Sequence, residues 1–501
     1  MRSFYRLTSI LVVALIAATA SAEETRDRVT GSGYFRLMAR PDLEGGTGAL
    51  GYWNLYGRLL NETSFAEFNL FMDLVQNNPG TNEPWARMGA RVAFTGFRTA
   101  DFQGGNLGNL KNDFQMKHFF LEAGNVFLKN VTWRFGTFDL YYNDLGTYDF
   151  RPSYVFLDTL GIGATYANDK LDFTLVAGDA GWEVRWPNYS TILTTGGRAR
   201  LHLSNHAEIG LGGQYRYEPA VSGNRNSPYS TPNLNYQDWV RGEVLQNFLD
   251  AHPGQITSFP NPVPTSAQSF TSFLYLGFGG FGALRWDNFY LQFQKFHPLG
   301  PTTETFNGQT YNIYTTSVTD RRYEGSAGNE MQLQLIPDRL DAVWAAWFQY
   351  DRDFDDAIRP TDGNRIATST LLRMQLYLTR VVHIIAEGSA AYEKSLNGNA
   401  YREHANSIFG STDGASDRRG LQFGDSDHRN TYQGKVGLVL NPGGFGIFAR
   451  PSIRLLYGLQ YSSQQAAYGN GFVQSLDQLN QFKSPERHFH SVLGLETEGW
   501  F

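Results

Sequence analysis

Stretches of alternating apolar and polar residues run along this chain. The connections between them are alternately tight turns and long polar segments. The tight turns carry Asn, Asp, Gly or Pro, which favour sharp reversals of the backbone. They fall at residues 61–63, 129–130, 168–169, 204–205, 287–288, 337–338, 379–380 and 441–444. A soluble β-sandwich does not sustain such a rhythm over a whole chain of this length. The pattern therefore predicts one large antiparallel sheet built from hairpins.

The turns also predict how many strands the sheet contains. Eight turns imply eight hairpins, which is sixteen strands, and residues 29–40 and 488–501 add one strand at each end, giving 18. Bacterial barrels require such an even number, with both ends on the same side of the membrane. We predict an all-β fold: a transmembrane antiparallel β-barrel of 18 strands with long extracellular loops. Residues 85–97 are also strand-like, so counts from 16 to 20 stay open.

Both ends of the chain predict export to an outer membrane. Arg2 and Arg6 precede an apolar stretch and the small residues 20–22, which is the pattern of a signal peptide. We expect cleavage after Ala22, leaving residues 23–501 as one barrel domain. The chain closes on Trp500-Phe501, as the last strand of such barrels does. The predicted location is the outer membrane of a Gram-negative bacterium, with its lipid as a partner.

Composition excludes several other classes of protein. The mean hydropathy of −0.37 is too low for a helical membrane protein. A net charge of −6 without a basic run excludes nucleic acid as a partner. No Gly-x-Ser-x-Gly or His-Glu-x-x-His motif is present, so we expect no enzyme, no catalytic residue, no cofactor and no metal site.

Alternation within each strand predicts which side chains face water. In residues 29–40, Tyr34 and Arg36 share one face, while Phe35 and Leu37 share the other. An arginine facing lipid at mid-membrane costs ~2–4 kcal/mol, so the charged faces must line the lumen. By this rule the lumen carries both signs, from Arg36, Arg58, Arg454, Glu67 and Asp73. Two interpretations stay open: a balanced, hydrated wall, or a track that hydrogen-bonds sugar hydroxyls.

Some aromatic residues share the wet face. Tyr34, Phe65 and Trp347 are placed there by parity. Rings in a water-filled lumen offer flat surfaces to the apolar faces of sugars. The alternative is that they pack beneath a loop folded into the barrel.

The loop most suited to fold inward is the third, residues 140–157, which is rich in tyrosine. An exposed loop rarely carries so many aromatic residues. Folding inward would place Asp144, Asp149 and Arg151 at a constriction of the pore. An outward patch for subunit packing is the alternative.

Several stretches, in order along the chain, resemble the maltoporin family of sugar porins. Near the start these are Gly33-Tyr34-x-Arg36, then Arg58-Leu-x-Asn-Glu62 and Phe65-Ala-Glu67. Towards the end they are residues 373–392, 433–443, 449–454 and 493–501. The spacing from Gly136 through Asp144 to Asp149-Phe150 also fits.

The resemblance implies an 18-stranded homotrimeric porin that guides oligosaccharides past an inward third loop. Tyr34 and Phe65 would then stand for its slide aromatics. The ionic tracks would be Arg36, Arg58, Glu67, Asp144 and Asp149. Arg151 and Ser462 stand where the family has aromatic residues, and the first-loop cysteine pair is missing, so a solute other than maltodextrin is plausible.

We therefore predict a channel for passive diffusion of sugars and other small hydrophilic solutes. The alternatives are a general diffusion porin and a barrel for polysaccharide export.

Overall fold

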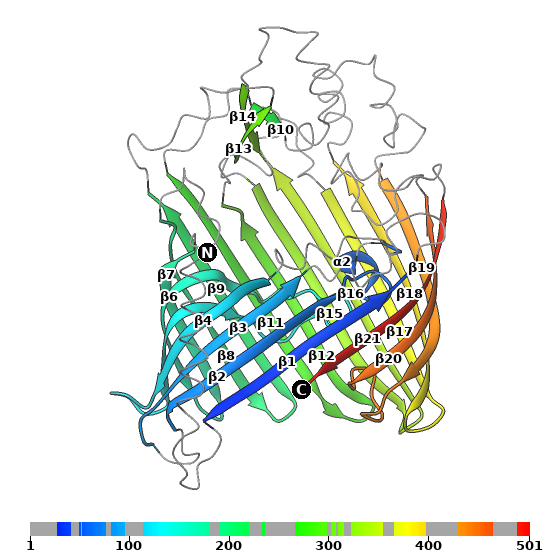
Figure 1. The fold of residues 1–501 in the computed structure, drawn as a ribbon, viewed down its shortest axis with the longest axis horizontal. Coiled ribbons are helices and arrows are strands. Elements are labelled where there is room, and N and C mark those ends of the chain that lie inside the picture. Colours follow the sequence, from blue (N-terminus) through cyan, green and yellow to red (C-terminus); the bar gives the residue numbers. More distant parts are fainter. Residues whose placement is uncertain are drawn as a thin grey trace, which may run out of the picture.

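The computed structural model describes residues 28–41, 50–51, 53–76, 82–95, 114–180, 191–219, 233–235, 266–297, 302–306, 309–314, 322–353, 365–396, 428–463 and 488–501. The predicted signal peptide, residues 1–22, lies outside these ranges. Most described residues belong to one antiparallel sheet that closes into a tall barrel (Figure 1).

Eighteen strands form the barrel, as predicted. They are β1 (Val29–Ala39), β2 (Phe65–Val75), β3 (Trp85–Thr95), β4 (Phe114–Gly124), β5 (Val131–Leu140), β6 (Val155–Ala167), β7 (Leu171–Asp179), β8 (Leu193–Ser204), β9 (Ala207–Glu218), β11 (Ala267–Phe281), β12 (Leu284–Lys295), β15 (Arg322–Ile336), β16 (Leu340–Asp353), β17 (Arg365–Tyr377), β18 (Val382–Ser395), β19 (His428–Leu440), β20 (Ser452–Ser462) and β21 (Phe489–Trp500).

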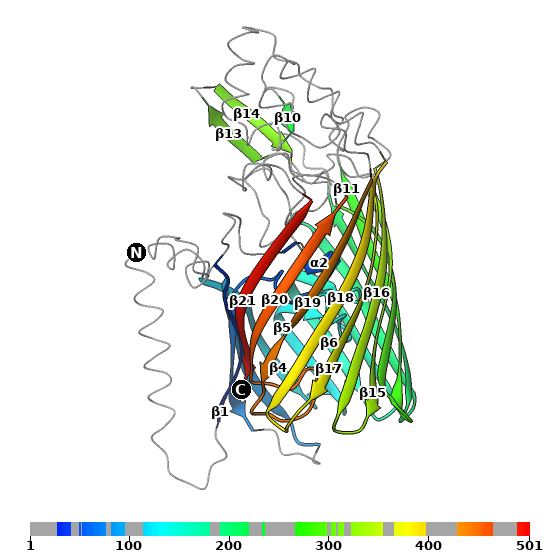
Figure 2. The ribbon, with the colours of Figure 1, turned by 90° about the vertical axis from the view of Figure 1, so that its right-hand side faces the viewer.

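The barrel closes because its first and last strands pair. Tyr34 of β1 lies opposite Trp500 of β21, and the register continues to Ala39 and Leu495. With every strand paired on both sides, no sheet edge is left to face lipid. A small sheet of β10 (Asn233–Asn235), β14 (Gln309–Tyr314) and β13 (Thr302–Phe306) lies beyond one rim (Figure 2).

The two faces of the barrel wall carry different side chains, as alternation predicts. In β20, Tyr457 is 49% exposed on the outer face, whereas Arg454 is 7% exposed and faces inward. Exposed leucine, phenylalanine, tyrosine and valine side chains cover the outer faces of many other strands. An apolar exterior on a closed barrel is the signature of a membrane-spanning structure. The chain is therefore an outer-membrane type β-barrel.

One predicted strand is wrong. The turn expected at residues 61–63 implied a strand just before it, but residues 53–60 include the short helix α2 (Trp53–Tyr56) and a turn inside the barrel. The second strand is instead β2, which pairs with β1, and β3, from the strand-like residues 85–97, makes up the number. Gly57 has a φ of +84°, which a strand does not tolerate. Among the residues that the structure describes, no helix is long and apolar enough to cross a membrane.

One predicted turn is also wrong. Asp287 and Asn288 lie within β12, and the reversal occurs earlier, at Gly282, where φ is +56°. Glycine adopts this left-handed backbone without the strain that a Cβ would bring. The Asn-Asp composition was therefore a weaker turn signal than the glycines before it.

The described part of the first loop, residues 50–64 without 52, packs against the inner wall. We call it the first-loop segment. Leu50, Leu59 and Leu60 are buried there. They contact apolar side chains of β18 to β21, which are Ile385, Val439, Leu456 and Val492. This apolar patch inside the lumen explains why the segment folds inward rather than extending the sheet.

The third loop, residues 141–154 between β5 and β6, also folds into the barrel, as predicted. Tyr142, Leu145 and Tyr148 are buried in one cluster with inner-wall residues of β11, β12, β16 and β17. Glu330 of β15 accepts hydrogen bonds from the backbone N–H groups of Gly146 (3.0 Å) and Thr147 (2.7 Å). The loop is thereby fixed across the lumen.

Candidate functional site

A cavity of about 790 Å³ lies where the two inward loops approach the wall. It is lined by Tyr34, Arg36, Arg58, Phe65, Glu67, Asn143, Asp144, Gly146, Asp149, Arg151, Trp286, Asn288, Glu330, Phe448, Arg450, Glu498 and Trp500. Five of these are aromatic, four are arginines and five are carboxylates. The cavity thus offers flat apolar surfaces beside groups of both charges.

The cavity gathers most of the residues that the sequence predicted as a site. Eight of the nine line it: Tyr34, Phe65, Arg36, Arg58, Glu67, Asp144, Asp149 and Arg151. Arg58 arrives on the first-loop segment rather than on the strand that was expected.

Trp347 is the predicted residue that does not line the cavity. It faces the barrel interior but is 7% exposed, and its ring lies 6.1 Å from that of Phe150 in the third loop. It packs beneath the inward loop, which was the alternative stated for these aromatic residues.

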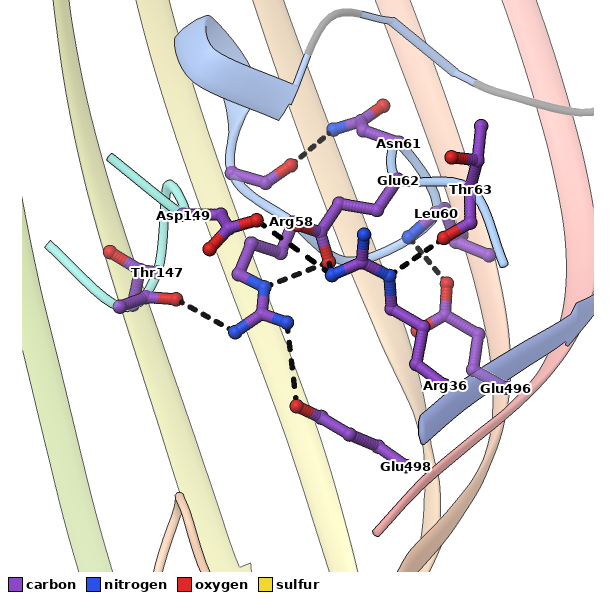
Figure 3. Close-up of polar contacts among 12 residues, drawn as sticks. Arg36, Arg58, Leu60, Asn61, Glu62, Thr63, Thr147, Asp149, Glu496 and Glu498 are labelled. Carbon is purple, nitrogen blue, oxygen red and sulfur yellow. Dashed lines mark hydrogen bonds and ion pairs between the residues drawn. The ribbon is translucent and has the colours of Figure 1, made fainter. Parts of the chain in front are cut away.

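Two arginines share one buried carboxylate between β1 and the first-loop segment (Figure 3). Arg36 Nη1 and Arg58 Nε each lie 2.8 Å from Glu62 Oε2. Arg36 Nη1 also lies 3.8 Å from Asp149 Oδ2 of the third loop. Glu62 therefore joins β1, the first-loop segment and, through Arg36, the third loop.

Glu498 of β21 is a second carboxylate that contacts several arginines. Arg450 Nη2 and Arg454 Nη2 each lie 2.6 Å from its Oε2. On its other oxygen, Oε1, it accepts a 2.9 Å hydrogen bond from the Tyr34 hydroxyl and lies 3.4 Å from Arg58 Nη2. Charge-assisted contacts of this kind hold side chains more firmly than neutral ones.

Burial and charge oppose each other at the loop carboxylates. Burial raises the pKa of Glu62 to about 7, against the lowering effect of Arg58 and Arg36. Burial likewise raises the pKa of Asp144, although Arg151 lowers it. For Asp149, burial is outweighed by Arg58, Arg36 and Arg151, which together hold its pKa below the usual range.

Arg151 is the most exposed of the four arginines that line the cavity. Its side chain is 40% exposed, and its nearest carboxylate oxygens, on Asp144 and Asp149, are 3.8 and 3.9 Å away. Its guanidinium lies over the ring of Tyr141, 4.7 Å from the centroid. A solute can reach this cation from the cavity.

Several cavity residues were not predicted as site residues. They are Glu62 beside the cavity and, lining it, Asn143, Gly146, Trp286, Asn288, Glu330, Phe448, Arg450, Glu498 and Trp500. Parity in the last strand would have placed Glu498 and Trp500 on the wet face, because both alternate with outward Leu493 and Leu495. Phe448 lies in a turn, where alternation carries no signal. Among the described residues, no group of three or more His, Cys, Asp or Glu side chains could hold a metal ion.

No protein-family model and no curated protein matches this chain in sequence. Solved outer-membrane structures are similar in fold. The channel DcaP of Acinetobacter baumannii has 8% identity and a TM-score of 0.42, covering 74% of this chain and 92% of that one. OprD of Pseudomonas aeruginosa has 8% identity and a TM-score of 0.40, covering 96% and 97%.

Wzi of Escherichia coli, described as a carbohydrate-binding β-barrel involved in capsule assembly, has 11% identity and a TM-score of 0.40. That match covers 94% of this chain and 84% of Wzi. At such identities the likeness concerns the fold alone. None of the three is a maltoporin, so the resemblance to that family rests on the sequence stretches, and solute preference must be argued from this lumen.

Proposed function

We propose that this barrel is a passive channel for small hydrophilic solutes, with sugars as the preferred class. The chain would be exported with residues 1–22 removed and would assemble in the outer membrane as a homotrimer. It would act by diffusion through the constriction rather than by catalysis.

One observation supports sugars above other solutes: the combination of rings and mixed charges in one cavity. Tyr34, Phe65, Trp286, Phe448 and Trp500 offer aromatic surfaces to the C–H faces of pyranose rings. Carboxylates and guanidiniums beside them accept from and donate to hydroxyl groups, which do both. Sites for small molecules commonly combine apolar walls with a few placed polar groups in this way.

The charges of the cavity nearly balance, which favours a neutral solute. Four arginines, Arg36, Arg58, Arg151 and Arg450, face five carboxylates, Glu67, Asp144, Asp149, Glu330 and Glu498, giving a formal charge of 4 − 5 = −1. A strongly charged ligand would meet repulsion from one set as well as attraction from the other. A polyol makes hydrogen bonds with both sets.

Uptake into liposomes tests this function. Vesicles carrying the purified barrel are placed in solutions of neutral oligosaccharides of rising length, and the swelling rate is followed by light scattering. We expect uptake that saturates with sugar concentration and depends on chain length, because the cavity holds the solute in transit. A smooth size cut-off without saturation would instead indicate a general diffusion porin. Empty vesicles and vesicles with a closed barrel of similar size serve as controls.

A further inference from the structure

We infer that Arg58 is a positioning residue that holds the tip of the third loop and so sets the width of the pore, and that Arg151 is the cation that solutes contact. This assignment rests on the proposed channel, but it needs ion conduction only, not sugar recognition. It gives different roles to two arginines that the sequence predicted as site residues of the lumen.

The guanidinium of Arg58 is occupied by contacts within the protein. Nε donates to Glu62 Oε2 (2.8 Å), Nη1 donates to the Gly146 carbonyl (3.3 Å), and Nη2 donates to the Tyr34 hydroxyl (2.8 Å). Nη2 also reaches Glu498 Oε1 at 3.4 Å. Four of its five N–H donors are thus used, and its side chain is 17% exposed. A solute would have to displace these partners to bind it.

The contacts of Arg58 converge on the tip of the third loop. Its backbone N–H donates to the Thr147 carbonyl (2.8 Å), and its side chain bonds the neighbouring Gly146 carbonyl. The N–H groups of the same two residues donate to Glu330 on β15. Arg58 therefore holds the tip through the carbonyl groups of Gly146 and Thr147. Glu330 holds it from the opposite side through the N–H groups of the same residues.

The backbone that carries Arg58 is itself fixed to the wall. Leu59 and Leu60 are buried in the apolar cluster, and the Leu60 N–H donates to Glu496 Oε1 (2.8 Å). Gly57, with a φ of +84°, packs closely against the wall, since a Cβ there would lie 2.2 Å from Leu371 Cδ1. Because its own backbone is fixed to the wall, Arg58 holds the tip of the third loop at a fixed distance from the wall.

Arg151 differs in each of these respects. Its side chain is more than twice as exposed as that of Arg58, and its carboxylate neighbours are beyond hydrogen-bond distance. It keeps donors free for a solute while its ring contact with Tyr141 orients it.

Single-channel recording in planar bilayers tests the assignment with the substitution Arg58→Lys. Lysine keeps the charge but cannot make the forked contacts, so the loop tip should loosen. We expect the conductance to rise about twofold, since it follows the open cross-section, with a reversal potential like that of the native pore. Arg151→Gln should instead shift the reversal potential towards cations and weaken block by a sugar acid about tenfold.

Arg87→Lys is the matched control. Arg87 faces the lumen from β3 and pairs with Glu122 at 2.7 Å, but it does not line the cavity, so its conductance should stay native. Native conductance in Arg58→Lys would overturn the inference. If that variant does not fold, as judged by heat-modifiable gel mobility, Glu330→Ala removes both acceptors of the same tip from the other side. Native conductance in Glu330→Ala would overturn it equally. Absence of sugar block in every pore would count against the proposed sugar preference. The conductance and reversal potential would still test the roles of the two arginines.

Discussion

At the scale of single residues, the constriction is built from buried ion pairs rather than from free charges. Glu62 and Glu498 each hold two or more arginines, and most of these side chains are less than one-fifth exposed. Such pairs contribute little net stability, because desolvation offsets their attraction, but breaking one partner leaves a buried charge. Their main effect here is to fix the geometry where the inward loops meet the wall.

The charge of Glu62 predicts a pH-dependent selectivity. Its raised pKa of about 7 means that the side chain is neutral below that pH and anionic above it. The reversal potential in a salt gradient should therefore move towards cations as the pH rises through about 7.

The same raised pKa predicts a pH-dependent stability. The folded state binds the proton of Glu62 more tightly than the unfolded state, so the resulting contribution to the free energy of unfolding is fully present below pH 4.5 and is lost as the pH rises through about 7.

Glu62→Gln removes the titrating group while keeping its shape. Recorded over the same pH range, this variant should show a weaker dependence of the reversal potential on pH near 7. An equally steep dependence in the variant would assign the titration to another group.

At the scale of elements, the first-loop segment and the third loop differ in how well the sequence predicts them. The inward position of the third loop could be predicted, because an exposed loop rarely carries so many tyrosines. The first-loop segment alternates like a strand over a few residues, and its leucines fit either a lipid-facing strand or a buried segment. What decides between them is the apolar patch of Ile385, Val439, Leu456 and Val492, more than three hundred residues away in sequence. Local periodicity carries no information about such a partner.

The apolar contacts between the first-loop segment and the inner wall predict the effect of Leu60→Ala. Truncating a fully buried leucine weakens packing by ~2–5 kcal/mol, which should release the segment from the wall. Hydrogen–deuterium exchange over residues 53–62 should become faster in the variant. Leu211→Ala, a truncation on the outer face of β9, should leave this exchange unchanged. Unaltered protection in Leu60→Ala would mean that the polar contacts alone hold the segment.

At the scale of the whole molecule, the barrel follows from pattern more than from any single residue. The inward side of the charged strand residues could be predicted because it depends only on alternation, and the total of 18 strands was right although one strand was misassigned. Residues 85–95, which alternate like a strand, form β3, and this strand brings the total to 18 in place of the misassigned one. Cavity residues in turns, such as Phe448, could not be predicted, because neither period nor composition marks where a turn points.

Adjacent residues of β2 test the wall directly, since Glu67 lines the cavity and Phe68 is exposed on the outer face. The chain has no cysteine, so Glu67→Cys and Phe68→Cys each introduce a single thiol. During single-channel recording, a charged, water-soluble thiol reagent should reduce the current stepwise in Glu67→Cys and leave Phe68→Cys unaffected. Stepwise loss of current in Phe68→Cys, or none in Glu67→Cys, would contradict a barrel whose solute pathway runs past this cavity.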